Sequence, residues 1–122
     1  MIKIYTTYFA KVKKLPSHIV PISICAKPPE GFQGAQYRDL KPTYNTLMDY
    51  KNTGDWEKFV ERYKAETLSK LDVRTVINDL KVLGYGKDIA LVCYEKSSDH
   101  CHRQIVAEWF REHGEECNEI NV

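Results

Sequence analysis

Apolar residues along the chain form short runs that are typical of β-strands. Residues 2–5 alternate between apolar and polar and are rich in β-branched and aromatic side chains, which predicts a first strand that ends about two residues later. Residues 19–25 predict a second strand, in which Pro21 must lie near the start or on an exposed edge. Residues 89–94 are continuously apolar, as in a central strand covered on both faces. The tail, residues 117–122, is a candidate edge strand.

Helical spacing of apolar residues predicts four helices after the second strand. Their ranges are residues 43–51, 56–67, 73–83 and 99–113. Asp55 and Asp72 are suited to cap the second and third helices, because a carboxylate accepts hydrogen bonds from first-turn N–H groups, and Gly84 ends the third. The aromatic residues from Trp56 to Tyr63 follow the spacing of a buried helix face, so we expect them to pack in the core rather than to stack on bases.

The alternation of strands and helices predicts an α/β fold. We expect one compact domain over residues 1–122, a small, mostly parallel sheet flanked by helices in a Rossmann-like arrangement. Residues 26–42 are rich in Pro and Gly and lack periodicity. Because long irregular loops are uncommon in compact domains and often cover binding sites, this loop is a candidate for closing over a ligand.

Composition and charge narrow the class of protein. The chain has 122 residues, 43% of them hydrophobic, which suffices for one core. Its net charge is +1, so no basic footprint points to nucleic acid, and a nucleic-acid partner is unlikely. Neither a signal peptide nor a run long enough to span a membrane is present, so we expect a cytoplasmic protein with no membrane partner and with four reduced cysteines. The oligomeric state stays open.

The strongest candidate for a functional site is the start of the last predicted helix, where Cys101, His102 and Arg103 follow one another. A buried strand that leads into a helix N-terminus is where α/β proteins commonly bind anions. The buried face of this helix is defined by Ile105, Val106, Trp109 and Phe110. Stepping 100° per residue places His102 near the centre of that face, Cys101 at its edge and Arg103 on the opposite flank.

Each of these residue types has a chemistry suited to that position. First-turn N–H groups attract anions, with Ser97 and Ser98 as predicted caps, and Arg103 offers a planar fork for phosphate or carboxylate. The helix field would lower the pKa of the Cys101 thiol and favour its thiolate. Glu95 would supply a carboxylate for acid–base catalysis.

Structural alternatives stand beside each of these roles. His102 could be a core histidine bonded to a carbonyl, Cys101 a small buried apolar residue, and Arg103 a surface residue paired with a nearby carboxylate. No dinucleotide fingerprint, Walker sequence or Cys-x5-Arg loop is present, so no cofactor is expected. Paired Cys-x2-Cys spacing is also absent, and adjacent ligands at Cys101 and His102 would be awkward on a helix, which argues against a metal.

The segment LVCYEKSSDHCHRQIVAEWF resembles the C-terminal signature of the family called domain of unknown function 488. That signature consists of an apolar strand with Cys and Glu at its end, a short polar loop, and Cys-His-Arg at the start of a helix. Upstream, Tyr37, Arg38, Leu40 and Pro42 match one branch of the family, so the resemblance covers nearly the whole chain. It implies a compact α/β domain and transfers no activity. Many relatives have Asp-x-Arg where this chain has Ser-Ile-Cys-Ala at residues 23–26, a departure that favours binding over catalysis.

Our leading hypothesis is a protein that binds a phosphorylated or otherwise anionic small molecule, such as a nucleotide. The predicted ligand-binding residues are Thr6, Thr7, Arg38, Tyr94 and Arg103. The second hypothesis is an enzyme of group transfer or hydrolysis, with Cys101 and His102 or Glu95 as its catalytic residues. The third is a protein–protein or regulatory module in which the Cys-His-Arg motif is structural.

Overall fold

The sheet is organised around one apolar strand near the end of the chain. The computed structural model describes residues 2–96 and 99–122. In this part of the chain the strands are β1 (Ile4–Tyr8), β2 (Ile19–Ser23), β3 (Ala35–Gln36), β4 (Asp88–Cys93) and β5 (Cys117–Glu119). They form one parallel sheet in the order β3-β2-β4-β1-β5. From Ile89 to Cys93 every residue of β4 is buried, because β4 lies in the middle of the sheet with protein on both faces.

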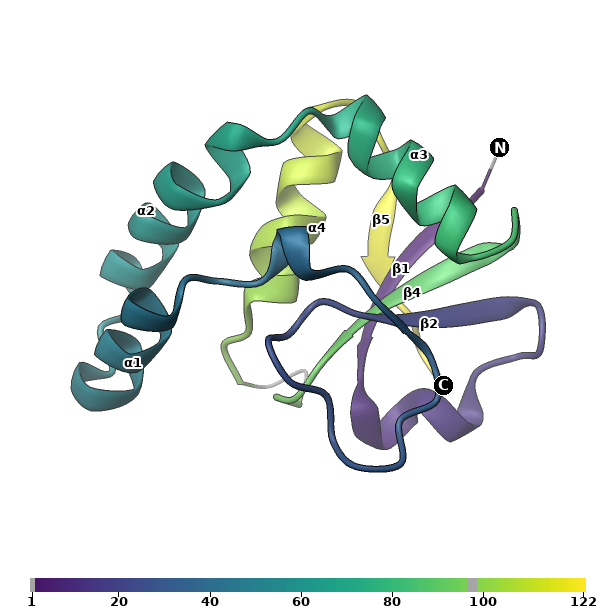
Figure 1. Cartoon of the computed structure of the whole chain (residues 1–122), viewed down its shortest axis with the longest axis horizontal. Helices are drawn as coiled ribbons and strands as arrows, with labels where there is room; N and C mark the ends of the chain where they lie inside the picture. The colour runs from purple at the N-terminus through teal and green to yellow at the C-terminus, as the bar shows by residue number, and fades with distance from the viewer. Residues whose placement is uncertain (1, 97–98) are drawn as a thin grey trace.

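Helices follow the strands and cover the sheet. The α-helices are α1 (Tyr44–Thr53), α2 (Trp56–Glu66), α3 (Val73–Leu83) and α4 (His102–Glu112), and the 3-10 helices are η1 (Phe9–Lys14), η2 (Arg38–Leu40) and η3 (Leu68–Lys70). Thr43, Asp55 and Asp72 cap the first three α-helices by accepting a hydrogen bond from a first-turn N–H. Figure 1 shows α1 and α2 as a pair to one side of the sheet, with α4 between them and the strands.

The pair formed by α1 and α2 reaches the core through aromatic side chains of α2. Phe59 and Tyr63 are buried, and the Tyr63 ring meets the His102 ring edge-on at 5.6 Å between centroids. Trp56 stacks on His100 at 4.5 Å. The prediction that the aromatic stripe packs against the protein core is therefore confirmed, and α2 closes one side of the segment that leads into α4.

The predicted α/β class with a parallel sheet is confirmed, and several boundaries differ from the prediction. β1 runs from Ile4 to Tyr8, so it begins about two residues later and ends about one residue later than predicted. The loop over residues 26–42 is not wholly irregular, since it contains β3 and η2. Pro21 lies within β2 at a point that β3 does not reach, since β3 pairs with Ile22 and Ser23 in the described sheet. Among the described residues, no helix is long and apolar enough to cross a membrane.

Candidate functional site

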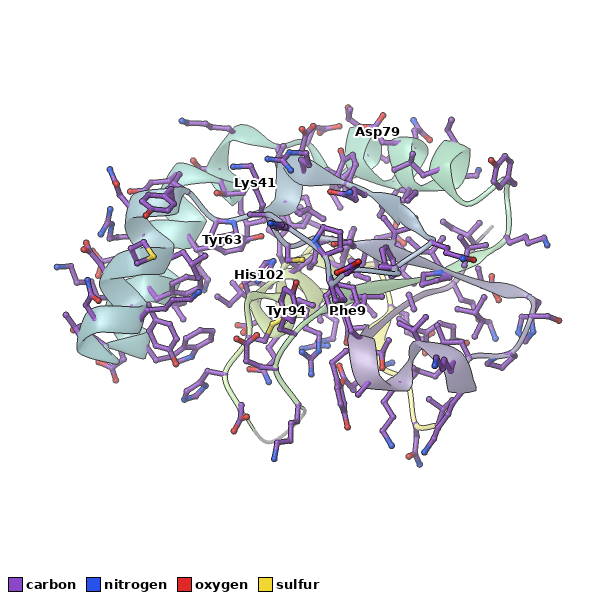
Figure 2. All side chains as sticks on the ribbon, turned by 60° about the horizontal axis from the view of Figure 1, so that its bottom comes forward. Phe9, Lys41, Tyr63, Asp79, Tyr94 and His102 are labelled. Atoms are coloured by element: carbon purple, nitrogen blue, oxygen red, sulfur yellow. A yellow bond between two sulfur atoms is a disulfide. The ribbon has the colours of Figure 1, made fainter. Side chains whose placement is uncertain are left out.

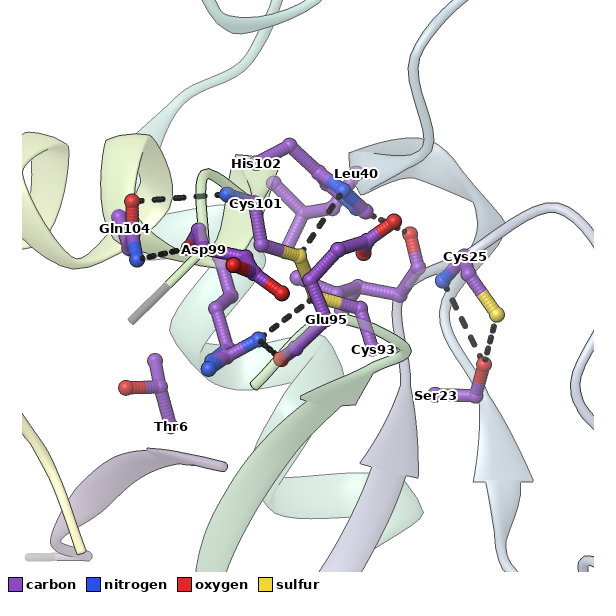
Figure 3. The surroundings of a disulfide bond; sticks show 12 residues. Thr6, Ser23, Cys25, Leu40, Cys93, Glu95, Asp99, Cys101, His102 and Gln104 are labelled. Atoms are coloured by element: carbon purple, nitrogen blue, oxygen red, sulfur yellow. Dashed lines mark hydrogen bonds between the residues drawn. A yellow bond between two sulfur atoms is a disulfide. The ribbon is translucent and has the colours of Figure 1, made fainter. Parts of the chain in front are cut away.

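Two cysteines meet where β4 ends and α4 begins. Cys93 is the last residue of β4, and Cys101 is the N-cap of α4 with an extended backbone, φ −147° and ψ 147°. Their sulfur atoms are joined in a disulfide, and both residues are buried (Figure 3). The expectation of four reduced cysteines is therefore wrong for this structure. Sequence spacing could not reveal the pair, because the chain must turn back after β4 to bring Cys101 beside Cys93.

The start of α4 also differs from the prediction. The helix begins at His102, three residues later than expected, and the predicted caps Ser97 and Ser98 lie outside the described residues. The backbone N–H of Cys101 donates to Oε1 of Gln104 at 3.4 Å, and Nε2 of the same amide donates to the carbonyl of Asp99 at 2.9 Å. The side chain of Gln104 therefore takes part in capping the N-terminus of α4, where an anion was expected to bind.

His102 points inward, as its helical phase predicts. Its Nε2 lies 2.8 Å from the carbonyl oxygen of Ile24, just beyond the end of β2. Because a carbonyl only accepts, Nε2 must carry the proton, which leaves the lone pair of Nδ1 directed toward Sγ of Cys101, 3.9 Å away. Burial lowers the pKa of His102 to about 4, and the nearby charge of Arg103 acts in the same direction. The ring is therefore neutral at pH 7 and holds a proton poorly.

Arg103 is fully buried, although its helical phase places it on the flank opposite His102. Its guanidinium makes a two-pronged ion pair with Glu119 of β5, with Nε and Nη2 each 3.0 Å from a carboxylate oxygen. Its Nη1 donates to the carbonyl of Glu95 at 2.6 Å and to Sγ of Cys93 at 3.4 Å. The Tyr8 ring lies against the cation, 5.5 Å from ring centroid to Cζ. Arg103 thus fastens α4 to β4 and β5, and its role as an anion clamp stays a prediction.

The two threonines of β1 point to opposite faces of the sheet. Thr6 is buried and donates to Oε1 of Glu119 at 2.6 Å, which adds a third group to the Arg103 ion pair. Thr7 is also buried, and its Oγ1 has no hydrogen-bond partner among the described residues. The sheet therefore separates the two side chains, and a single ligand on one face would not meet both. Their predicted role in ligand binding is untested.

The remaining predicted site residues are Tyr94, Glu95 and Arg38, and two of them bind the loop over residues 26–42. The Tyr94 hydroxyl donates to the carbonyl of Lys27, and Nη1 of Arg38 donates to the carbonyl of Ala26, so both fasten the start of the loop over residues 26–42. Figure 2 shows Tyr94 beside Phe9, and their ring centroids are 4.9 Å apart. Tyr94, Glu95 and Arg38 are all exposed. The predicted loop therefore lies next to the candidate site.

The two remaining cysteines are buried thiols. Sγ of Cys25 lies 3.2 Å from the hydroxyl of Ser23, and burial raises the pKa of the Cys25 thiol. Burial raises the pKa of Cys117 to about 12. Because the thiolate is the reactive form of cysteine, neither residue is suited to act as a nucleophile at neutral pH. Cys25 occupies part of the segment in which relatives have Asp-x-Arg.

The structure thus brings together Cys93, Cys101, His102 and Arg103, with Glu95 at the edge of the cluster (Figure 3). A family model described as the Active DUF488-N3 subclade matches residues 4–114 of the chain. The chain belongs to the DUF488 family. The resemblance inferred from the Cys-His-Arg signature is therefore confirmed. No curated protein and no solved structure matches this DUF488 protein.

Sequence reasoning missed two groups that shape the site. The first is the Ile24 carbonyl, which sets the tautomer of His102 and which no side-chain pattern could show. The second is Glu119, the ion-pair partner of Arg103, which lies in the tail that was expected to form an edge strand. A sequence pattern pointed toward this residue. If the predicted tail strand pairs with β1 in parallel, Glu119 lies opposite Thr6.

Proposed function

We propose that this DUF488 protein is a thiol–disulfide enzyme whose redox centre is the pair Cys93 and Cys101. The observation that carries the proposal is the disulfide itself, placed between a strand end and a helix N-terminus. Disulfides in cytoplasmic proteins are usually transient and serve catalysis or redox sensing. The proposal therefore includes the cytoplasmic location expected from the sequence, where small thiols would reduce the pair. The name of the matching subclade, which calls it active, supports an enzymatic role.

In the proposed reaction the reduced pair transfers two electrons to a small disulfide substrate. The Cys101 thiolate, stabilised by the N-terminus of α4, attacks one sulfur of the substrate, and the substrate S–S bond breaks. The departing thiolate takes a proton, and Cys101 is left in a mixed disulfide. The Cys93 thiolate, to which Arg103 donates a hydrogen bond, then attacks Sγ of Cys101 and releases the second thiol. The products are the protein disulfide and two substrate thiols. Two cellular thiols then reduce the protein disulfide and leave as their own disulfide, which restores the dithiol.

The neutral His102 ring has a positioning role in this reaction. Because its Nε2 is held by Ile24, the Nδ1 lone pair is available to accept the S–H of Cys101 in the reduced protein. The low pKa of His102 makes the ring a poor store for that proton at pH 7, so the proton passes on to solvent. The helix N-terminus, rather than an imidazolium, is therefore the main source of thiolate stabilisation.

Because Cys93 and Cys101 are buried, a substrate reaches the sulfurs only when the chain opens locally, and in our proposal the contact between Tyr94 and the Lys27 carbonyl is the one that opens. Arg38 is an exposed cation close to this contact, as is Lys27, and it supports a modified form of the anionic-ligand hypothesis. In that form the substrate carries a carboxylate or phosphate that binds near Arg38. Two hypotheses stay predictions. One is that this anion is a nucleotide, and the other is that the Cys-His-Arg motif is purely structural in a regulatory module.

Thiol mapping tests the redox centre. Protein equilibrated in glutathione buffers of stated ratio is quenched in acid and alkylated, and the labelled peptides are identified by mass spectrometry. We expect Cys93 and Cys101 to gain label together as the buffer becomes reducing, with a midpoint in the range of cellular thiol pairs, roughly −300 to −180 mV. Cys25→Ser is the matched control and should leave the midpoint unchanged. Full alkylation of both residues even in oxidised glutathione would refute the proposal.

An activity assay then tests the substrate. The initial rate of reduction is measured for glutathione disulfide, which is anionic, and for the neutral bis(2-hydroxyethyl) disulfide. Arg38→Ala should raise KM for the anionic substrate and leave KM for the neutral one unchanged. Equal changes for both substrates would remove Arg38 from substrate binding without affecting the thiol mapping.

A further inference from the structure

We infer that the reduced form of the same centre is a metal site, in which Cys93, Cys101 and Nδ1 of His102 bind a zinc-like divalent cation and leave a fourth position open. The inference rests on the proposed function in one respect, that the cysteine pair can be reduced. Among the described residues, the Sγ atoms of both cysteines and a ring nitrogen of His102 all lie within 4.8 Å of one another. Two thiolates, an imidazole and an open position are a known ligand set for catalytic zinc.

The orientation of His102 is the second observation, and it is independent of the cysteines. Histidines that bind metal through one ring nitrogen almost always donate the other N–H to a carbonyl, a carboxylate or water. The carbonyl of Ile24 fills that role here, 2.8 Å from Nε2, and it fixes the lone pair of Nδ1 on the side of Cys101. A carbonyl from a segment distant in sequence, just beyond the end of β2, therefore holds the ring in the tautomer and direction that a ligand requires.

The backbone at Cys101 removes the geometric objection to adjacent ligands. That objection assumed that Cys101 and His102 both lie on the helix, where successive side chains diverge by 100°. Cys101 instead has the extended conformation of an N-cap, with φ −147° and ψ 147°. Its side chain is free of the helical phase and turns toward the same point as His102, as Figure 3 shows.

The backbone also leaves room for the cation. The Cα atoms of Cys93 and Cys101 are 7.3 Å apart. Two sulfurs bound to one tetrahedral zinc at about 2.3 Å each lie about 3.8 Å apart, so the pair must open from the disulfide by side-chain rotation. Nη1 of Arg103 lies 3.4 Å from Sγ of Cys93 and would donate to the ligated thiolate, with its own charge balanced by Glu119.

Charge balance favours a dication in this buried position. Reduction adds two electrons and two protons to the disulfide, and metal binding releases both thiol protons. Two thiolates then neutralise the two charges of the cation, so the buried assembly of metal and ligands carries no net charge. Oxidation to the disulfide removes two of the three ligands and expels the metal. The redox state of the pair would therefore decide whether the centre holds a metal.

Cobalt binding provides the test, because Co²⁺ substitutes for Zn²⁺ and reports its ligands in the absorption spectrum. The full chain is reduced with a phosphine, which is itself oxidised to the phosphine oxide, and is then freed of metal and titrated with Co²⁺ without oxygen. We expect one equivalent to bind, with a thiolate-to-cobalt charge-transfer band and intense visible bands of tetrahedral Co²⁺. Zn²⁺ should displace it, and the disulfide form should show neither band.

Variants assign the ligands. Cys101→Ser and His102→Gln should each weaken binding by at least about 100-fold, the upper end of the loss caused by removing an outer-shell partner. Cys25→Ser and His100→Gln are matched controls and should bind as the wild type does. A shift of the His102 Nδ1 resonance on addition of Zn²⁺, in the nitrogen NMR spectrum of the unmutated protein, checks the assignment if a variant fails to fold.

Two outcomes would overturn the inference. One is a reduced wild-type protein that circular dichroism shows to be folded and that takes up neither Co²⁺ nor Zn²⁺. The other is Co²⁺ binding that keeps its wild-type affinity in Cys101→Ser or is lost in Cys25→Ser. These results are separable from the proposed function. Cysteines that never form the disulfide but bind Co²⁺ would refute the function alone, whereas a reversible disulfide with no metal binding would refute this inference alone.

Discussion

Two valine substitutions at adjacent positions of β1 should have opposite effects on stability. Thr6→Val should destabilise the protein, whereas Thr7→Val should stabilise it. Thr6 and Thr7 are both buried, and valine has nearly the same shape and a similar preference for strands. Thr6 donates a hydrogen bond to the Glu119 carboxylate at 2.6 Å, whereas Oγ1 of Thr7 has no partner in the described part of the chain. The two substitutions therefore compare a satisfied and an unsatisfied buried hydroxyl in one strand.

The magnitudes follow from those contacts. A hydrogen bond to a charged group contributes about 1.5–3 kcal/mol, and we take the lower end, about 1.5 kcal/mol, for Thr6→Val because water can reach Glu119. An unsatisfied buried hydroxyl costs about 1–3 kcal/mol, so Thr7→Val should add about 1 kcal/mol to the free energy of unfolding. For a chain of 122 residues, each kcal/mol moves Tm by about 4 °C. We expect Tm to fall by about 6 °C in Thr6→Val and to rise by about 4 °C in Thr7→Val.

Calorimetry and urea unfolding of the two variants, with the cysteine pair kept in one redox state, measure both effects. An unchanged m-value would show that neither variant alters the unfolded state. A loss of stability in Thr7→Val would refute the reasoning, because it would mean that the Thr7 hydroxyl makes a stabilising contact. Equal effects of the two substitutions would likewise refute it.

Three further predictions concern the surroundings of the site. Glu119→Gln should lower the free energy of unfolding by about 2–3 kcal/mol in urea unfolding, because it leaves the buried Arg103 cation without its counter-charge, and a change below about 0.5 kcal/mol would contradict this. The pKa of His102 is about 4 in the folded protein against an ordinary 6.5, so the unfolded state binds more protons between these values. Stability should therefore be highest above pH 6.5 and fall by about 3 kcal/mol as the pH drops to 4, and His102→Gln should flatten that slope in urea unfolding at a series of pH values. Gly34→Ala should cost about 1–3 kcal/mol by the same assay, because the new methyl group would lie 2.5 Å from the carbonyl oxygen of Pro21, and a neutral effect would show that β3 can shift freely.

Local patterns predicted the elements of this fold because the forces that form them are local. Asp55 and Asp72 cap the helices that they were expected to cap, since the capping contact spans three residues. The apolar run of β4 likewise predicted its central position in the sheet. The strand order could not be predicted from these patterns, because it depends on how the connections cross the sheet.

The candidate site was located by sequence, whereas its internal contacts were not. Helical phase placed His102 on the inner face correctly. It misplaced the Arg103 guanidinium, because helical phase gives the direction of the Cα–Cβ bond and not the position of the far end of a long side chain. The long Arg103 side chain reaches across to Glu119, 16 residues further along the chain. The pairing of Cys93 with Cys101 could not be predicted, because the two residues belong to different elements, the end of β4 and the N-cap of α4, and no periodic pattern links them.

The parallel pairing of β1 also constrains how the protein is made. β1 ends at residue 8, yet both of its neighbours, β4 and β5, come from residues 88–93 and 117–119. During translation the first strand therefore leaves the ribosome long before either partner exists. Contacts this distant in sequence slow folding, and unpaired apolar strands are prone to aggregate. Completion of the sheet, and with it the enclosure of Cys93 and Cys101, must wait until β5 has been synthesised, more than 100 residues after β1.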